Sequence, residues 1–335
     1  MVGPVAIAII THRRGYEADH VIDELRRRGL EPVRLNSDDF PGRYQVSLRL
    51  GRRPPAISLR VPGGAIDADA IGVAWYQQPP VFHFDEGLAP AGRMMAERES
   101  RPFLDAIWRL APWRWLNSPH AVDRARDKLL QLRLAARVGL RTPPTLASND
   151  ERQIRTFCER HQWDVIIKDL SLGVVTIDAG SYHSFTRLFT PEDLRDLTSL
   201  RFGPALLQRN IRKDHELRVT VVGDGVFAAR IDSQASPIAR IDYRRGELWS
   251  EPQRYAGTDL PPDVQDACRA ITKALGLGYG AIDLIVDPAG EVYFLEVNAT
   301  GAWIWIERLT GLPITAAIAD RLIQMADLRS DKGAQ

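Results

Sequence analysis

The chain alternates short apolar runs with amphipathic segments, and their order predicts an open α/β unit in its first third. Strand-like segments are expected at residues 5–10, 32–35, 44–61 (a hairpin around 51–55) and 71–76. Two segments carry apolar residues at helical spacing: residues 18–28, and residues 91–111 with Met94, Met95, Phe103, Leu104 and Ile107 facing inward.

The middle of the chain mixes helices and strands. One long helix is expected over residues 122–138, ending at Gly139, with Leu129, Leu130, Leu132, Leu134 and Ala135 toward a core. Asn149 and Asp150 can cap a helix that runs to about residue 161. Strands at 163–168 and 174–177 follow, and then a helix at 191–198.

From Pro204 the pattern becomes mainly β. Strands are expected at residues 205–208, 217–222, 226–231, 279–286 and 291–297, and helices at 267–275 and 314–325. The turns at 223–225 and 287–290 join neighbouring strands into hairpins. The breaks at Asn117-Ser-Pro119 and at Pro204 suggest three units. We therefore expect an α/β protein with α+β lobes, divided into an open α/β unit (1–117), a central unit (118–203) and a C-terminal unit (204–330).

The amino-acid composition limits the classes of protein to which the chain can belong. The chain has 335 residues, 44% of them hydrophobic, and a formal net charge of +1. These values are typical of a globular protein and argue against a strongly basic nucleic-acid binder. Two cysteines exclude a disulfide framework or a Cys-rich zinc site. No apolar run is long enough for a membrane span, and no basic segment precedes residues 5–10, so we expect a soluble cytoplasmic protein with no membrane partner.

The last predicted hairpin carries a candidate metal site. Asp283 lies on its first strand, and Glu296 and Asn298 lie two residues apart on its second, on one face. Two carboxylates and an amide oxygen suit Mg²⁺, which takes its other ligands from phosphates and water. The alternative is a charged, solvent-facing hairpin. An unpaired carboxylate inside the apolar stretch Tyr-Phe-Leu-Glu-Val would be costly, so the metal hypothesis is favoured.

Two of the five lysines are candidates for phosphate contacts. Lys128 lies in the long helix, and Lys168 ends the apolar strand at 163–168. Arg218 and Arg230 lie on the hairpin at 217–231 and need anions as partners, for which Glu216 and Asp232 are intramolecular alternatives. Asp242-Tyr-Arg244 is either a further charged cluster or a plain loop pair.

In this order the residues resemble the ATP-grasp enzymes, and more closely the graspetide synthetases, which are microviridin-type peptide macrocyclases. The stretches that carry the resemblance are Asn36…Asp39-Phe-Pro41, Gly139-Leu-Arg-Thr-Pro143, Lys213-Asp-His-Glu-Leu-Arg-Val-Thr-Val-Val-Gly223, Ile231-Asp-Ser-Gln234, Asp242-Tyr-Arg244, Phe294-Leu-Glu-Val-Asn-Ala-Thr-Gly-Ala-Trp-Ile-Trp-Ile-Glu307 and Thr310-Gly-Leu-Pro313. They span nearly the whole chain. Four stretches depart from the family pattern. Gln77-Gln-Pro79 replaces a paired Arg-Arg-Pro, Asn298-Ala-Thr-Gly301 replaces Asn-Pro-Asn-Gly, and Arg209 replaces an acidic residue. The loop that begins at Asp169 is poor in glycine for a phosphate-covering loop.

The resemblance implies an ATP-grasp fold behind a pre-ATP-grasp domain, with ATP and Mg²⁺ as cofactors. It implies that Lys128 and Lys168 contact phosphates and that the hinge Gln208, Arg209, Asn210 and Ile211 holds the adenine. Asp283, Glu296 and Asn298 would hold Mg²⁺, Arg218 and Arg230 would act at the transferring phosphoryl group, and Asp242 and Arg244 would hold peptide.

The implied partner is a ribosomally made precursor peptide with a leader and an acidic core, and the implied assembly is a homodimer. The peptide's Asp or Glu side chains would be phosphorylated and then joined to Ser, Thr or Lys side chains. Three alternatives remain open: a ligase that adds an amino acid to a protein or small molecule, a small-molecule kinase, and a nucleotide-binding regulator. The stretch 231–244 favours the macrocyclase.

Overall fold

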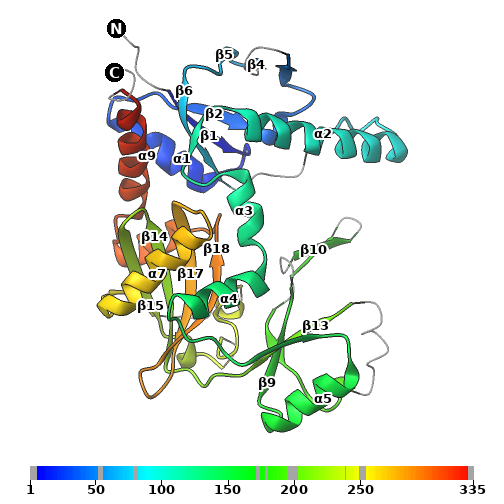
Figure 1. The fold of residues 1–335 in the computed structure, drawn as a ribbon, viewed down its shortest axis with the longest axis vertical. Coiled ribbons are helices and arrows are strands. Elements are labelled where there is room, and N and C mark those ends of the chain that lie inside the picture. Colours follow the sequence, from blue (N-terminus) through cyan, green and yellow to red (C-terminus); the bar gives the residue numbers. More distant parts are fainter. Residues whose placement is uncertain are drawn as a thin grey trace.

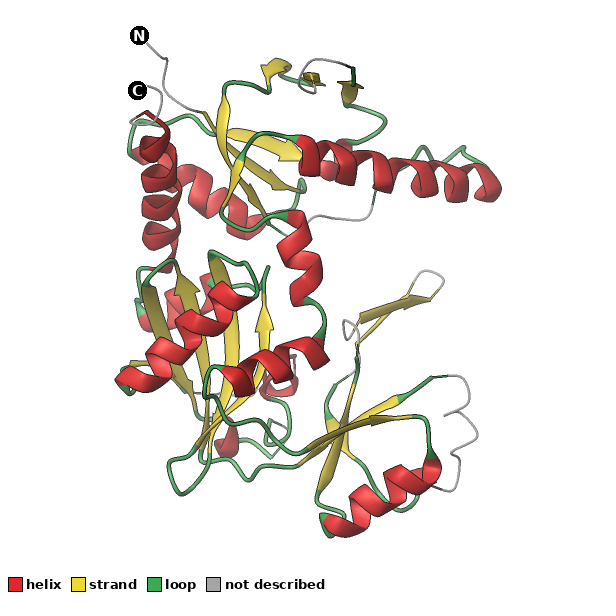
Figure 2. Ribbon diagram, viewed as in Figure 1, coloured by secondary structure: helices red, strands yellow, loops and turns green. Residues whose placement is uncertain are grey.

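A computed structural model of the chain describes residues 6–51, 56–77, 82–170, 174–177, 180–183, 185–194, 203–237, 239–248 and 254–330. Three layered units follow one another down the long axis of the molecule (Figures 1 and 2). The N-terminal unit lies at the top of the view, the sheet of the C-terminal unit in the middle, and the central unit below and to one side.

The N-terminal unit is built on a parallel four-stranded sheet in the order β2-β1-β6-β7. Its strands are β1 (Ala6–Thr11), β2 (Val33–Asn36), β6 (Ile71–Tyr76) and β7 (Arg114–Trp115), and its helices are α1 (Tyr16–Arg27) and α2 (Pro90–Leu110). A second, antiparallel sheet consists of β3 (Gln45–Arg49), β4 (Ala56–Val61) and β5 (Gly64–Asp67). A 3-10 turn, η1 (Ser37–Asp39), follows β2. Strands β1 and β6 are buried along most of their length, which explains their continuous apolar sequences.

The central unit has an antiparallel four-stranded sheet in the order β12-β9-β13-β8, with one helix packed against it. Its elements are β8 (Thr145–Ser148), α5 (Glu151–Arg160), β9 (Val165–Lys168), β12 (Arg187–Leu188) and β13 (Ala205–Arg209). A separate hairpin is formed by β10 (Val174–Ile177) and β11 (Gly180–His183). The Asp150 side chain accepts hydrogen bonds from the backbone N–H groups of Arg152 and Gln153, and this cap fixes the start of α5.

The C-terminal unit is an antiparallel five-stranded sheet in the order β16-β15-β14-β17-β18. The strands are β14 (His215–Val222), β15 (Gly225–Ile231), β16 (Tyr255–Thr258), β17 (Tyr279–Val286) and β18 (Val292–Asn298). Its remaining elements are α3 (Pro119–Ala125), α4 (Lys128–Arg137), η3 (Ser233–Ala235), α6 (Tyr243–Leu248), α7 (Pro262–Ala274), α8 (Ile304–Thr310) and α9 (Ile314–Ser330). Helices α3, α4 and α7 share one apolar core with the sheet.

A second apolar core joins the sheet of the C-terminal unit to the N-terminal unit. It contains Ile9 and Trp75 from the N-terminal sheet, Tyr279 from β17, and Trp303 and Ile318 from the α8–α9 region. Helix α9 runs beside α1 and down to β14 (Figure 1). The N-terminal unit is therefore anchored on the sheet that carries the candidate site.

Asn117, in one of the two predicted breaks, locks these units together. Its side chain is fully buried and donates to the backbone oxygens of Tyr279 and Ala299 at 2.9 and 2.8 Å. Its amide oxygen accepts from the N–H groups of Gly278 and Tyr279, both at 2.9 Å. The amide is fully satisfied, so it can be buried without the penalty of an unpaired polar group.

The prediction of one helix over residues 122–138 was wrong. The chain forms α3 and α4 with a break at Arg126 and Asp127, and the Asp127 side chain caps α4 by accepting from the N–H of Leu130 at 2.9 Å. An aspartate cap competes with helix continuation, because it bonds to N–H groups that are free only at a helix start. Lys128 therefore begins a helix instead of lying inside one.

The assignment of Met94 and Met95 to the interior was also wrong, since these side chains are 65% and 49% exposed. They lie on the half of α2 that projects past the sheet (Figure 1). Leu129 is also exposed. The strands expected at 71–76 and 279–286 have those bounds in the structure. Elements β5, β7, β8, β11, β12, β16, α6 and α8 were not predicted. The helix expected at 191–198 is a short turn over 191–194, with 195–198 outside the described residues.

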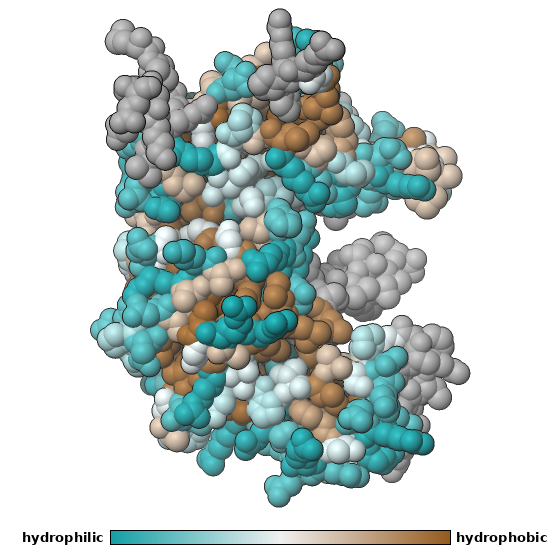
Figure 3. All heavy atoms as spheres, viewed as in Figure 1, coloured by the Kyte–Doolittle hydropathy of each residue, from teal (hydrophilic) through white to brown (hydrophobic). Residues whose placement is uncertain are grey.

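The α/β class expected from the sequence is confirmed by one parallel sheet, several antiparallel sheets and the helices packed on them. None of the helices in the described part of the chain is both long and apolar enough to cross a membrane. In the space-filling view, polar side chains cover most of the outer rim, and hydrophobic ones gather in the middle of the molecule around α4 (Figure 3).

Candidate active site

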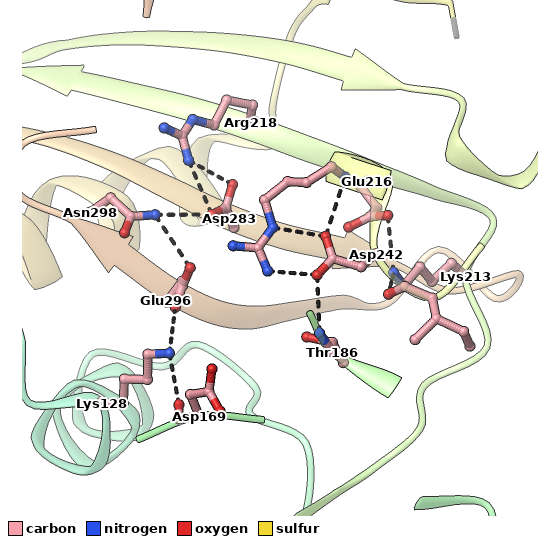
Figure 4. Close-up of polar contacts among 12 residues, drawn as sticks. Lys128, Asp169, Thr186, Lys213, Glu216, Arg218, Asp242, Asp283, Glu296 and Asn298 are labelled. Carbon is pink, nitrogen blue, oxygen red and sulfur yellow. Dashed lines mark hydrogen bonds and ion pairs between the residues drawn. The ribbon is translucent and has the colours of Figure 1, made fainter. Parts of the chain in front are cut away.

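The polar face of the C-terminal sheet brings charged residues of three strands into one row. Arg218 on β14 is paired with Asp283 on β17, and Asp283 is paired with Glu296 on β18. Directly opposed residues of antiparallel strands point to the same side of the sheet, and Asn298 shares the face of Glu296 because it lies two residues on. Figure 4 shows these side chains side by side.

Hydrogen bonds hold this row in place. Arg218 donates through Nη1 to both carboxylate oxygens of Asp283 at 2.9 and 3.0 Å and through Nη2 to the Ala302 oxygen at 3.2 Å. The Asn298 amide donates to Asp283 at 3.2 Å and to Glu296 at 3.4 Å, so it bridges the two carboxylates (Figure 4). Rotation of this amide would present its oxygen to the same point.

The three groups fit a divalent cation. Carboxylate and amide oxygens are hard donors of the kind that Mg²⁺ prefers, and a small number of them leaves room for phosphate and water oxygens. The described residues contain no cluster of three or more His, Cys, Asp and Glu side chains that could hold a metal. The set Asp283, Glu296 and Asn298 has only two acids, so it fits a cation whose coordination is completed by other ligands.

The two carboxylates differ electrostatically. Burial raises the pKa of Asp283, against the opposing charge of Arg218. Burial acts to raise the pKa of Glu296 as well, but the charges of Lys128 and Lys168 hold it below its usual value. Glu296 is thus ionised, and a cation bound here would offset the penalty of burying both carboxylates together.

Two lysines from different units face Glu296. Lys128, the first residue of α4, donates to the Asp169 backbone oxygen at 2.8 Å and lies 3.6 Å from a Glu296 carboxylate oxygen. Lys168, the last residue of β9, has its pKa lowered by burial to about 8, although Glu296 acts to raise it. Both ammonium groups project into the space between the central and C-terminal units.

That space is a cleft lined by residues of both units. Its walls come from β9, the 209–213 connection and the 241–244 segment, with the β14–β17–β18 face behind them. The predicted site residues among its lining are Lys128, Lys168, Arg209, Asn210, Ile211, Asp242, Arg244, Asp283 and Glu296.

The four predicted hinge residues do not all line the cleft. Arg209, Asn210 and Ile211 line the cleft, whereas Gln208 is buried behind it and donates to Thr145 Oγ1 at 3.0 Å. The N–H groups of Arg209 and Asn210 are already bonded to the oxygens of Pro144 and Asp164, both at 2.9 Å. Recognition of a planar base at this edge would therefore fall mainly to backbone oxygens and to the N–H of Ile211.

Arg230 does not join the site. Its register partner is Leu217, which belongs to the opposite, apolar face of the sheet, and its side chain is 41% exposed. It donates to Asp232 at 2.9 Å and to Asp214 at 3.4 Å. Because residues 218 and 230 differ by one position in the strand alternation, only Arg218 faces Asp283. The intramolecular partner Asp232 was the correct alternative for Arg230.

Asp242 and Arg244 form both a loop pair and a part of the cleft wall. Arg244 donates to the two oxygens of Asp242 at 2.8 and 2.5 Å, and the second oxygen also accepts from the Thr186 N–H at 3.2 Å. Burial acts to raise the pKa of Asp242, but the hydrogen-bonded Arg244 guanidinium holds it below its usual range. The bond from Thr186 to Asp242 connects the central unit to the C-terminal one across the cleft (Figure 4).

Lys213 and Glu216 are cleft residues to which the sequence reasoning gave no role of their own. Both side chains are buried, and Lys213 donates to Glu216 at 3.0 Å and to the Ile241 oxygen at 2.8 Å. Glu216 had been considered only as a partner for an arginine. The alternation that places 216 and 218 on one face was visible in the sequence and could have identified Glu216 as part of the polar face.

Family models match both halves of the chain. The MvdD pre-ATP-grasp domain matches residues 6–123, and the RimK-like ATP-grasp domain matches residues 125–322. A RiPP-associated ATP-grasp ligase of Chryseobacterium gregarium, solved with ADP and a leader and core peptide, superimposes with a TM-score of 0.87 at 30% identity. The superposition covers 95% of this chain and 96% of that one.

Two further relatives, one solved structure and one curated sequence, are also similar to this chain. The macrocyclase MdnC of Microcystis aeruginosa, solved with its precursor peptide MdnA, has a TM-score of 0.84 at 30% identity over 95% of this chain and 99% of its own. A probable alpha-L-glutamate ligase of Haemophilus influenzae is 28% identical over 61% of this chain. The chain spans only 57 to 66% of the length of the first curated relatives that it matches in sequence.

Proposed function

The chain belongs to the ATP-grasp family, with a RimK-like ATP-grasp domain behind an MvdD-type pre-ATP-grasp domain, and we propose that it closes rings within a ribosomally made precursor peptide. The observation that carries the proposal is the cleft in which Lys128 and Lys168 face the carboxylates of Asp283 and Glu296. The likeness to peptide-bound relatives over nearly the whole chain favours a peptide substrate.

The proposed reaction has two steps. A carboxylate oxygen of an Asp or Glu side chain of the peptide attacks the γ-phosphorus of ATP, and the bond from that phosphorus to the bridging oxygen breaks, releasing ADP. The product is an acyl phosphate. A Ser or Thr hydroxyl, or a Lys amine, of the same peptide then attacks the acyl carbon and loses its proton, and phosphate leaves.

The residues of the cleft have separate roles in this scheme. Lys128 and Lys168 bind phosphate oxygens, and the 209–211 hinge holds the adenine with Gln208 supporting it from behind. Arg218 places a fixed positive charge beside Asp283, where the acyl phosphate is held. Asp283, Glu296 and Asn298 would hold Mg²⁺, which when bound offsets charge on the transferring phosphoryl group.

The remaining assignments complete the proposal. Asp242 and Arg244 contact the peptide at the wall of the cleft, where the Arg244 side chain stays 46% exposed. The chain acts as a homodimer. Its division into functional units at 1–117, 118–203 and 204–330 follows the order of the sheets along the chain, although α3 and α4 pack on the C-terminal sheet and β13 belongs to the central one. Arg230 has no catalytic role, because it lies on the far face of the sheet.

Mass spectrometry of the peptide tests the function. The protein is incubated with ATP, Mg²⁺ and a short acidic peptide that contains Ser or Thr and is encoded beside its gene. We expect the loss of one water for each linkage, with one ADP formed each time, and no change with the Glu296→Gln variant. An ester bond is cleaved by mild base, whereas an amide survives it.

Other outcomes favour the alternatives. An unchanged peptide mass, with ADP release that depends on an added amino acid, would favour the ligase activity that the likeness to alpha-L-glutamate ligases suggests. Transfer of phosphate to a small molecule without loss of water would instead indicate a kinase.

A further inference from the structure

A second cavity adjoins the nucleotide cleft at its metal-binding end. It lies between the α3–α4 connection and the end of β18. Lys128 and Glu296 line both spaces. A phosphoryl group bound by Lys128 beside Glu296 would therefore lie where the two spaces meet. The nucleotide would reach this position from the cleft, and the attacking group would reach it from the second cavity.

The wall of this cavity is apolar along one side and cationic at its inner end. Val122, Ala125 and Ala299 present small apolar side chains, which leave room for an extended chain. Of the described residues that line it, the cations are Arg126 and Lys128, and the one carboxylate is Glu296, which already faces Lys128. The cavity therefore has one cation, Arg126, that the candidate metal and phosphate groups do not engage.

Arg126 owes its position to the break between α3 and α4. It is the last residue before the Asp127 cap, two positions ahead of Lys128. Its guanidinium is 51% exposed and donates to Asp123 at 2.9 Å, and Asp123 is equally exposed. Asp105 of α2 is also within range of its charge, with no hydrogen bond between them among the described contacts. An exposed pair three residues apart contributes little, so the guanidinium can exchange this partner for a substrate carboxylate.

We propose that this second cavity receives the peptide segment whose side chain is activated, and that Arg126 binds a carboxylate of that segment. The inference rests on the proposed function and specifies the substrate for it: a peptide with acidic side chains close together, one at Lys128 and another at Arg126. An arginine suits this role, because its planar guanidinium can form two parallel hydrogen bonds with one carboxylate.

Steady-state kinetics test the inference. ADP release is measured at varied concentrations of the precursor peptide and of ATP for Arg126→Ala, with Arg133→Ala as the matched control. Arg133 is an exposed arginine on α4 that lines neither space. We expect the KM for peptide to rise about ten- to hundredfold in Arg126→Ala, the usual range for a lost charged hydrogen bond, with the KM for ATP changed less than twofold. Arg126→Lys should recover part of the loss, since it keeps the charge without the fork.

A second variant distinguishes a direct contact of Arg126 with the peptide from a purely structural effect of the substitution. Asp123→Ala leaves Arg126 in place and frees its guanidinium, so the KM for peptide should stay the same or fall. A KM for peptide that is unchanged in Arg126→Ala, or that rises in Asp123→Ala as much as in Arg126→Ala, would overturn the inference while the wild-type protein still cyclises the peptide. Failure of the wild-type protein to release ADP with any such peptide would instead contradict the proposed function, and the inference with it.

Discussion

The two faces of the C-terminal sheet share the same five strands but differ in chemistry around Arg218 and Asp283, where one face is apolar and the other carries charged side chains. Leu217, Val219 and Val221 of β14 point to one face and are buried against α4 and α7. Glu216, Arg218 and Thr220, between them, point to the other. On the apolar face burial is favourable by itself, whereas on the polar face each buried charge needs a partner, as in Lys213–Glu216 and Arg218–Asp283.

This difference explains how one strand can both stabilise the fold and carry chemistry. The apolar face holds the strands in register, and the register then sets the spacing of charges on the other face without any loop flexibility. Substitutions on the two faces should therefore separate cleanly into effects on turnover and effects on stability.

The largest effect is expected from the polar face. Glu296→Gln removes an ionised carboxylate that faces Lys128 and Lys168, so turnover should fall by at least about 10³-fold, comparable to the loss of a key electrostatic group in other enzymes. The measurement is ADP release, with thermal unfolding as the control that the fold is intact. Turnover close to that of the wild type would contradict the metal assignment.

On the apolar face, Leu284→Ala should give the opposite result. Leu284 is fully buried in the core between the sheet, α4 and α7, and its truncation should lower the free energy of unfolding by about 3 kcal/mol. Denaturant unfolding measures this loss. The folded variant should keep its kcat, and a kcat lowered as far as in Glu296→Gln would break the proposed separation of the faces.

Lys168 belongs to the central unit and lies across the cleft from the polar face. Its substitution therefore tests what the central unit contributes to nucleotide binding. Lys168→Ala should weaken ADP binding by roughly ten- to hundredfold, because one charged contact to phosphate is lost. Titration calorimetry gives the affinity, and Lys273→Ala, an exposed lysine of α7, is the matched control. Equal ADP affinity in the two variants would reject a phosphate role for Lys168.

The smallest effect is expected for Arg230→Ala. Its exposed ion pairs with Asp214 and Asp232 should change the free energy of unfolding by no more than about 0.5 kcal/mol and kcat by less than twofold. Arg218→Ala is the comparison variant, and its kcat should fall about a hundredfold. Similar kcat values for the two variants would mean that the assignment of the faces is wrong.

Local patterns predicted most elements, and failed where a side chain competes with the backbone. The strands at 71–76 and 279–286 follow from apolar runs bounded by turns. The helix break at Asp127 was missed because the apolar spacing continues through it, and only the N-cap contact with Leu130 reveals the new start. The exposure of Met94 and Met95 depends on how far α2 extends beyond its sheet, which spacing alone does not encode.

The sequence by itself determined the α/β class, because the order of apolar and amphipathic segments gives the order of strands and helices. It also determined that Asp283, Glu296 and Asn298 share one face of a hairpin, because that depends on the period of two within the hairpin. Only the tertiary structure decided which arginine reaches the site, how Lys128 and Lys168 converge on Glu296, and that Lys213 pairs with Glu216. These contacts join segments brought together by strand register, a helix start and the docking of two units. Such long-range geometry arises from packing the whole chain, and no local window of residues contains it.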